Sequence, residues 1–158
     1  MEEKISAFHK RNLIIWGAIF AGVIALSVVA YFLNKNHSFY PLPQAYQVNQ
    51  ILFIAAIVLA GSILVFKRSN FVPSKIADRI SRLNVAENKL EYLFPKLLRN
   101  YFIVWALGEA IALIGFINFV FTADFSSYLI FAVVSAYSLL INIPNEGFIY
   151  KCLDLIEG

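Results

Sequence analysis

Charged residues are scarce in this sequence. They make up 15% of its 158 residues, whereas hydrophobic residues make up 60%. An ordinary soluble domain carries about 25% charged residues, and a disordered chain combines low hydrophobicity with high charge. A soluble globule of this length could not bury so much apolar surface. The composition therefore excludes both classes and indicates an integral membrane protein with a single domain, residues 1–158.

Cysteine is almost absent, and so are the usual catalytic motifs. The single cysteine, Cys152, can form neither an intrachain disulfide nor a thiolate metal centre. His9 and His37 lie at opposite ends of the first apolar run, so they cannot share a metal ion. No histidine is placed to bind haem inside a run or to activate Ser62 as a nucleophile. We therefore expect a protein that is not an enzyme and that holds no metal and no cofactor.

Long apolar runs are what the sequence has in abundance. Four of them cover residues 13–33, 48–66, 101–121 and 125–143. About 20 apolar residues in a helix cross a hydrocarbon core of about 30 Å. The three-residue link 122–124 makes the last two runs an antiparallel hairpin. The sequence thus predicts an all-α integral membrane four-helix bundle.

The positions of the lysine and arginine residues predict the orientation of this bundle. All 13 except Lys35 lie before the first run, in the loop 67–99, or after the fourth run. The positive-inside rule then places both termini and the loop 67–99 in the cytoplasm. We expect a bacterial inner (plasma) membrane protein whose basic loop contacts anionic lipid headgroups and binds no nucleic acid. The opposite loop contains Pro41 and Pro43, which favour an extended segment.

The central loop and the C-terminal tail contain amphipathic stretches. One helix is predicted to begin at Pro73, with Ser74 as its N-cap, and a second is predicted to break at Pro95. Their apolar faces comprise Ile76, Ile80 and Leu83 in the first, Leu90, Leu93, Phe94 and Leu97 in the second, and Phe148, Ile149, Cys152 and Ile156 in the tail. These stretches predict short amphipathic helices on the cytoplasmic membrane surface, with their basic sides toward the headgroups.

Glu109 is the one charged residue inside the four apolar runs. It lies about 13 Å into the bilayer when counted from Asn100 along a helix. An ionised carboxylate at that depth costs about 2.5–3.5 kcal/mol, so we expect Glu109 to face protein and to be largely protonated. Matching of depths along the helices adds the other members of a candidate intramembrane polar site, which comprises Glu109, Ser135, Ser138, Asn142 and Ser62.

Two interpretations of Glu109 are open. It either donates one hydrogen bond that fixes helix packing or it carries protons or ions. Small residues predict close helix packing at Gly108, Ala112 and Gly115 in the third run and at Gly17 and Ala21 in the first. We expect a non-enzymatic subunit or scaffold that associates with itself or with other membrane subunits. The alternative is a proton- or ion-coupled transporter or channel component that uses Glu109.

The stretch Ala106–Phe116 has the sequence Ala-Leu-Gly-Glu-Ala-Ile-Ala-Leu-Ile-Gly-Phe. It resembles the carboxylate-bearing helix of the proteolipid (c) subunits of rotary ATP synthases. The resemblance implies that Glu109 is a proton or sodium site. The glycine-repeat helix of that family is absent, so the resemblance is confined to this part of the chain. Taken whole, the chain is similar to the many small four-helix membrane proteins of bacteria.

Overall fold

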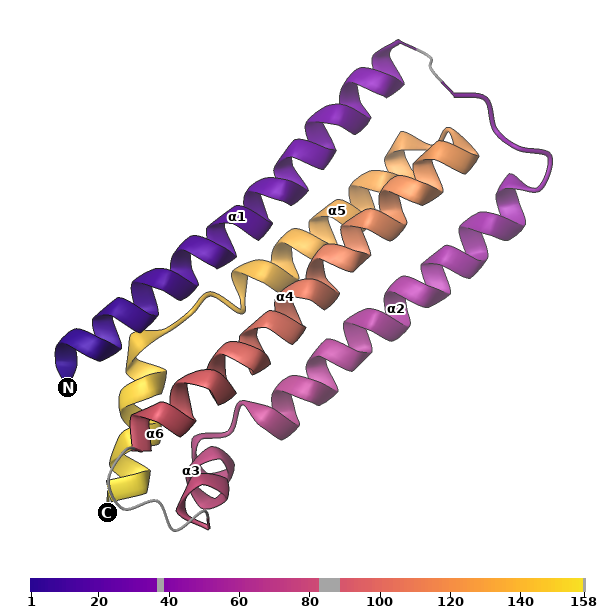
Figure 1. The fold of residues 1–158 in the computed structure, drawn as a ribbon. Coiled ribbons are helices and arrows are strands. Elements are labelled where there is room, and N and C mark those ends of the chain that lie inside the picture. The colour runs from indigo at the N-terminus through magenta and orange to yellow at the C-terminus, as the bar shows by residue number, and fades with distance from the viewer. Residues whose placement is uncertain (37–38, 83–88, 158) are drawn as a thin grey trace.

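The protein consists of helices and short connections. The computed structural model describes residues 1–36, 39–82 and 89–157 and contains no strand within them. Figure 1 shows α1 (Glu2–Lys35), α2 (Ala45–Asn70), α3 (Pro73–Ser81), α4 (Lys89–Thr122), α5 (Phe125–Leu140) and α6 (Glu146–Glu157). Helices α1, α2 and α4 are long and apolar enough to cross a membrane, and α5 is a shorter apolar helix. The all-α prediction is confirmed.

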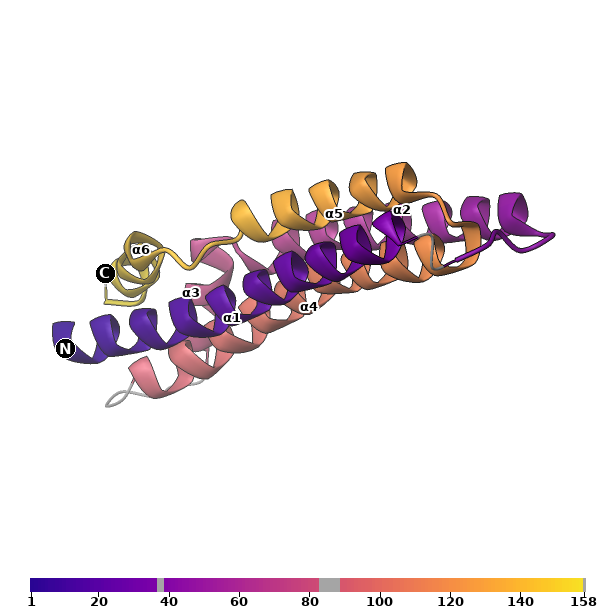
Figure 2. The same ribbon diagram turned by 90° about the horizontal axis from the view of Figure 1, so that it is seen from above.

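Helix α4 occupies the centre of the structure. It packs against α5, α2 and α1, and α1 also contacts α5. These four helices run alongside one another, while α3 and α6 lie together at the end of the molecule that holds both termini (Figures 1 and 2). The predicted hairpin is confirmed, because α4 ends at Thr122 and α5 begins at Phe125. Its turn places Ala123 in the left-handed region, with φ of 54°.

Two predicted helix boundaries are wrong. Helix α4 continues through Pro95 instead of breaking there. Pro95 is exposed and lies in the second turn of α4. Because proline has no N–H, the carbonyl group of Glu91 loses its donor, but Glu91 lies in the first turn, near the beginning of the helix. Ser74 is not the N-cap of α3, because Val72 holds that position and Pro73 is the first helical residue, where its missing N–H is harmless. Leu83 and His37 lie outside the described residues.

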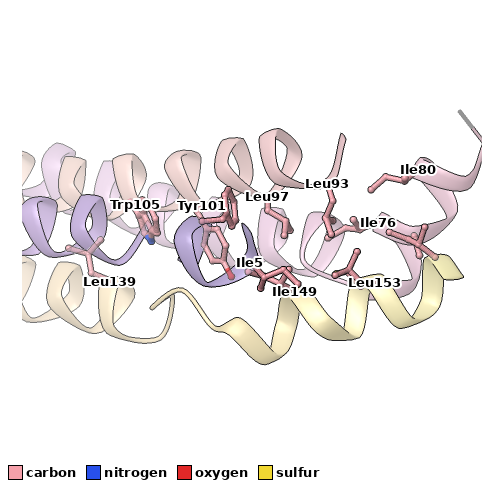
Figure 3. Close-up of a cluster of buried hydrophobic side chains, with 14 of the residues drawn as sticks. Ile5, Ile76, Ile80, Leu93, Leu97, Tyr101, Trp105, Leu139, Ile149 and Leu153 are labelled. Carbon is pink, nitrogen blue, oxygen red and sulfur yellow. The ribbon is translucent and has the colours of Figure 1, made fainter. Parts of the chain in front are cut away.

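The amphipathic helices bury their apolar faces in protein. The side chains between α3, α6 and the beginnings of α1 and α4 form one cluster, which we call the α3–α6 core (Figure 3). Its buried members are Ile5, Phe8, Ile76, Ala77, Ile80, Leu93, Leu97, Ile149, Cys152, Leu153 and Ile156. Protein therefore covers these apolar faces, and the position of α3 and α6 on a membrane surface stays a prediction. The second predicted surface helix is instead the beginning of α4.

An aromatic cluster lies at the opposite end of the molecule. Phe119 and Tyr128 are buried there, and Phe39 meets Phe119 edge-on with ring centroids 5.7 Å apart. The backbone N–H of Leu42 donates to the carbonyl oxygen of Phe121, at 3.0 Å. The non-helical segment 39–42, predicted as extended, thus lies across the α4–α5 hairpin.

Candidate functional site

Glu109 lies on the side of α4 that faces α1. A Cβ atom placed on Gly22 of α1 would be 3.4 Å from Oε1 of Glu109, so the carboxyl group rests against α1 where α1 has no side chain. The residue is half-buried. Within the described ranges, its carboxyl group forms no hydrogen bond of standard geometry. Glu109 therefore lies at the contact between α4 and α1, where its carboxyl group faces a glycine.

The polar face of α5 packs against α4 at the preceding residue, Gly108. Ser135 Oγ donates to the carbonyl oxygen of Gly108 at 2.7 Å, and Asn142 Nδ2 donates to the carbonyl oxygen of Ser138 at 2.6 Å. The hydroxyl group of Ser138 is buried and has no hydrogen-bond partner among the described residues, and it lies 3.4 Å from the position of a Cβ on Gly108. Consecutive helical residues point about 100° apart. The structure thus brings Ser135 and Ser138 to Gly108, joins Asn142 to the backbone of Ser138, and leaves Glu109 on a neighbouring face.

Ser62 lies apart from both groups. It is exposed on α2, and its hydroxyl group donates to the carbonyl oxygen of Val58 in the same helix, at 2.8 Å. It lines a groove of about 620 Å³ whose wall is formed by α2, with Val58, Gly61, Ser62, Val65, Phe66, Ser69 and Asn70 as lining residues. The polar site anticipated from depth alone is therefore distributed over three helix faces.

The small residues fall into two classes. Gly108, Ala112 and Gly115 are buried in α4, and a Cβ on Gly115 would overlap Phe131 Cβ at 2.3 Å. In α1, by contrast, Ala21 is exposed and a Cβ on Gly17 would meet nothing within 4 Å. The small residues of α4 are used within the chain, whereas those of α1 face away from it.

Polar contacts that the sequence reasoning missed connect the helices. Ser27 Oγ and the hydroxyl group of Tyr128 lie 2.8 Å apart between α1 and α5. Asn118 Nδ2 donates to Asn49 Oδ1 across the α4–α2 contact, also at 2.8 Å. Asn49 is near the beginning of the run 48–66 and Asn118 is near the end of the run 101–121. Both therefore lie at the same depth along the helices, and matching of depths could have found this pair. Asn12 is also buried, and its amide atoms have no partner within the described part of the chain.

Comparisons with known proteins assign no family to this arrangement. No family model, curated protein or solved structure matches the chain. Among the described residues, no three His, Cys, Asp or Glu side chains are grouped to hold a metal ion. The described residues offer one carboxyl group at a helix contact and several hydrogen bonds between helices.

Proposed function

We propose that this protein is a non-enzymatic, multi-pass membrane subunit or scaffold, which joins a second copy of itself or other membrane subunits through the outer face of α1. The single observation that carries the proposal is the outward position of Gly17 and Ala21, with open space at Gly17. Small residues spaced four apart let two helix backbones approach closely in lipid, where packing replaces the hydrophobic effect as the driving force.

The distribution of burial supports this role for α1. In the most apolar stretches of α1 and of α2, 11% of residues are buried, against 44% in α4. Helix α4 is thus the interior helix of the bundle, and α1 presents most of its surface outward. A helix partner at Gly17 and Ala21 would bury part of that surface without displacing any side chain of this chain.

The proposed topology has four crossings, by α1, α2, α4 and α5, with both termini and the α3–α6 core in the cytoplasm. Helices α1 and α4 have 34 residues each, and α5 has 16. At 1.5 Å per residue these helices measure about 51 Å and about 24 Å. The long helices exceed the hydrocarbon core, so their first turns would stand in water, and the short one would cross with slight local thinning.

Native gel electrophoresis of the protein extracted in mild detergent tests the proposal. We expect Gly17→Leu or Ala21→Leu to convert a larger complex into the free chain. The matched control is Ala106→Leu, which adds similar bulk to an exposed position of α4 and should leave the complex intact. A complex of unchanged size in both α1 variants would overturn the proposal.

The second candidate is a proton- or ion-coupled carrier that uses Glu109. Its position favours this function, because it is the one acid of the apolar runs and lies half-buried against Gly22. Intramembrane acids at such contacts mark proton and ion paths in many proteins. Proton or sodium flux into vesicles that contain the purified protein should vanish in Glu109→Gln. A flux that persists in this variant, or no flux in the wild type, would overturn it.

A further inference from the structure

Three cationic side chains gather where α2, α3 and α4 meet. Arg79 of α3 donates through Nη1 to Oδ1 of Asn70, the last residue of α2, at 3.3 Å. The carbonyl oxygen of Asn70 accepts a hydrogen bond from Asn100 Nδ2 of α4, at 2.9 Å. Lys96 and Arg99 stand in the turn of α4 before Asn100, and their three-residue spacing places them on one side of the helix.

These cations act on one another. Burial lowers the pKa of Lys96, and the charges of Arg99 and Arg79 lower it further. Over residues 1–36, 39–82 and 89–157, the side-chain ion pair present joins Arg82 to Asp78, with 2.9 Å between Nη2 and Oδ2. The carboxylate of Asp78 thus pairs with Arg82 and not with Arg79. Positive charges held close together in this way favour the arrival of an anion.

The groove along α2 leads to this group. Its lining begins with Val58, Gly61 and Val65 and ends with the polar residues Ser69 and Asn70. A Cβ on Gly61 would meet nothing within 4 Å, so the glycine leaves the groove open near its apolar end. From Val58 to Asn70 the helix rises about 18 Å. That length is close to one leaflet of a hydrocarbon core of about 30 Å.

We propose that the groove along α2 holds one acyl chain of an anionic phospholipid, whose headgroup phosphate is bound by Arg79, Lys96 and Arg99. The apolar end of the groove, around Val58 and Val65, suits the acyl chain, and Asn70 at the polar end is hydrogen-bonded to Arg79. Basic pockets beside membrane helices on the cytoplasmic side are known to recognise such headgroups. The site lies on α2, away from the outer face of α1, and is therefore independent of the proposed assembly surface.

The headgroup part of the proposal is tested by native mass spectrometry of the full chain with phosphatidylglycerol and with phosphatidylcholine of identical acyl chains. We expect one retained phosphatidylglycerol per chain and weaker retention of phosphatidylcholine. The triple variant Arg79→Gln, Lys96→Gln, Arg99→Gln should bind phosphatidylglycerol about 100-fold more weakly. The control Lys4→Gln, Lys10→Gln, Arg11→Gln removes the same charge elsewhere and should bind as the wild type does. Equal losses in both triple variants would overturn the proposal.

The groove is tested separately. Gly61→Leu fills open space and should weaken retention of phosphatidylglycerol, whereas Gly17→Leu fills equally open space on α1 and should not. Glycerol phosphate, which carries the anion without acyl chains, should fail to displace the lipid. Displacement by glycerol phosphate, or unchanged retention in Gly61→Leu, would overturn the acyl-chain assignment. Loss of the larger complex in Gly17→Leu with lipid still bound would separate this site from the assembly face.

Discussion

The indole nitrogen of Trp16 donates a hydrogen bond to the carbonyl oxygen of Leu139, 3.0 Å away, and so ties α1 to the end of α5. Trp105 of α4 does the same for the carbonyl oxygen of Asn142, also at 3.0 Å. The last carbonyl groups of a helix have no partner within it, and in a membrane protein water does not reach all of them. Two tryptophans from different helices therefore donate to carbonyl groups at, and just beyond, the end of α5.

Replacement of either tryptophan by phenylalanine should weaken the bundle. Trp105 is fully buried, so Trp105→Phe leaves a buried acceptor and should cost about 1–3 kcal/mol of unfolding free energy. Trp16 is half-buried, and Trp16→Phe should cost about 1 kcal/mol. Unfolding by sodium dodecyl sulfate in mixed micelles measures both. Tyr137→Phe, at an exposed position, is the control and should change nothing; an equally stable Trp105→Phe would contradict the account.

Gly115 should tolerate no side chain. An added methyl group would overlap Phe131 Cβ, which every residue except glycine carries, so the helices α4 and α5 must separate. We expect Gly115→Ala to lower the unfolding free energy by about 1–3 kcal/mol. Gly17→Ala, in open space, should be neutral or slightly stabilising, since alanine is the better helix former. The same micelle titration compares the two variants, and equal stability would refute the tight contact.

Ala123→Gly should stabilise the α4–α5 hairpin. The φ of 54° at Ala123 places an alanine in the left-handed region, where an L-residue loses about 1–2 kcal/mol. Glycine avoids this strain but loses about 0.5–1 kcal/mol more in backbone entropy, which leaves a net gain on the order of 0.5 kcal/mol. Ala123→Val should destabilise. Melting temperatures in detergent test the opposite signs, and a shift of the same sign in both variants would be inconsistent with the turn.

Cys152 should resist modification in the folded protein. Burial raises the pKa of its thiol group from 9.0 to about 11. Maleimide labelling near neutral pH should be slow until the protein is unfolded, whereas the control Leu155→Cys, exposed on the same helix, should label quickly in the background Cys152→Ala. Between pH 9 and pH 11 the unfolded chain releases the thiol proton and the folded chain keeps it. Stability should therefore fall as pH rises through that window, and Cys152→Ala should remove this slope.

Asp124 should add an acid-sensitive contribution to stability. The Ser127 hydroxyl group, which donates to Oδ2 at 2.5 Å, holds the pKa of this carboxyl group below 3.8, with help from the backbone N–H groups of Ser126 and Ser127 and against the effect of burial. The contribution is present above pH 3.8 and is lost as the pH falls through the lower folded value. Unfolding measured from about pH 6 to about pH 3 should show the loss, and Asp124→Asn should flatten it. An identical pH profile in Asp124→Asn would argue against this cap.

The sequence predicted the helices well and their ends poorly. Uncharged apolar runs identify helices because a membrane leaves the backbone few other ways to satisfy its hydrogen bonds. The length of an apolar run does not reveal that α1 and α4 begin among the polar residues that precede their runs. Their extensions are held by tertiary contacts, such as the stacking of Phe8 on Phe94 at 4.2 Å, which no local pattern records.

Matching of depths found part of the polar arrangement. It placed Ser135 near the level of Glu109, and Ser135 bonds to the carbonyl group of Gly108, one residue away. It could not resolve which side of α4 each residue faces, because depth fixes the position along a helix and not the rotation about it. Glu109 therefore turned out to face Gly22 of α1, a contact that requires the packing of two helices distant in sequence.

The dependence of the α3–α6 core on α6 has a consequence for biosynthesis. Ile76 and Ile80 are covered by α6, which follows α3 by more than sixty residues, so they remain uncovered until α6 has been synthesised. Helices α1, α2, α4 and α5 can form before that point, but the α3–α6 core cannot be completed without α6. A chain truncated before α6 would expose the apolar face of α3 to water, and such a patch favours aggregation.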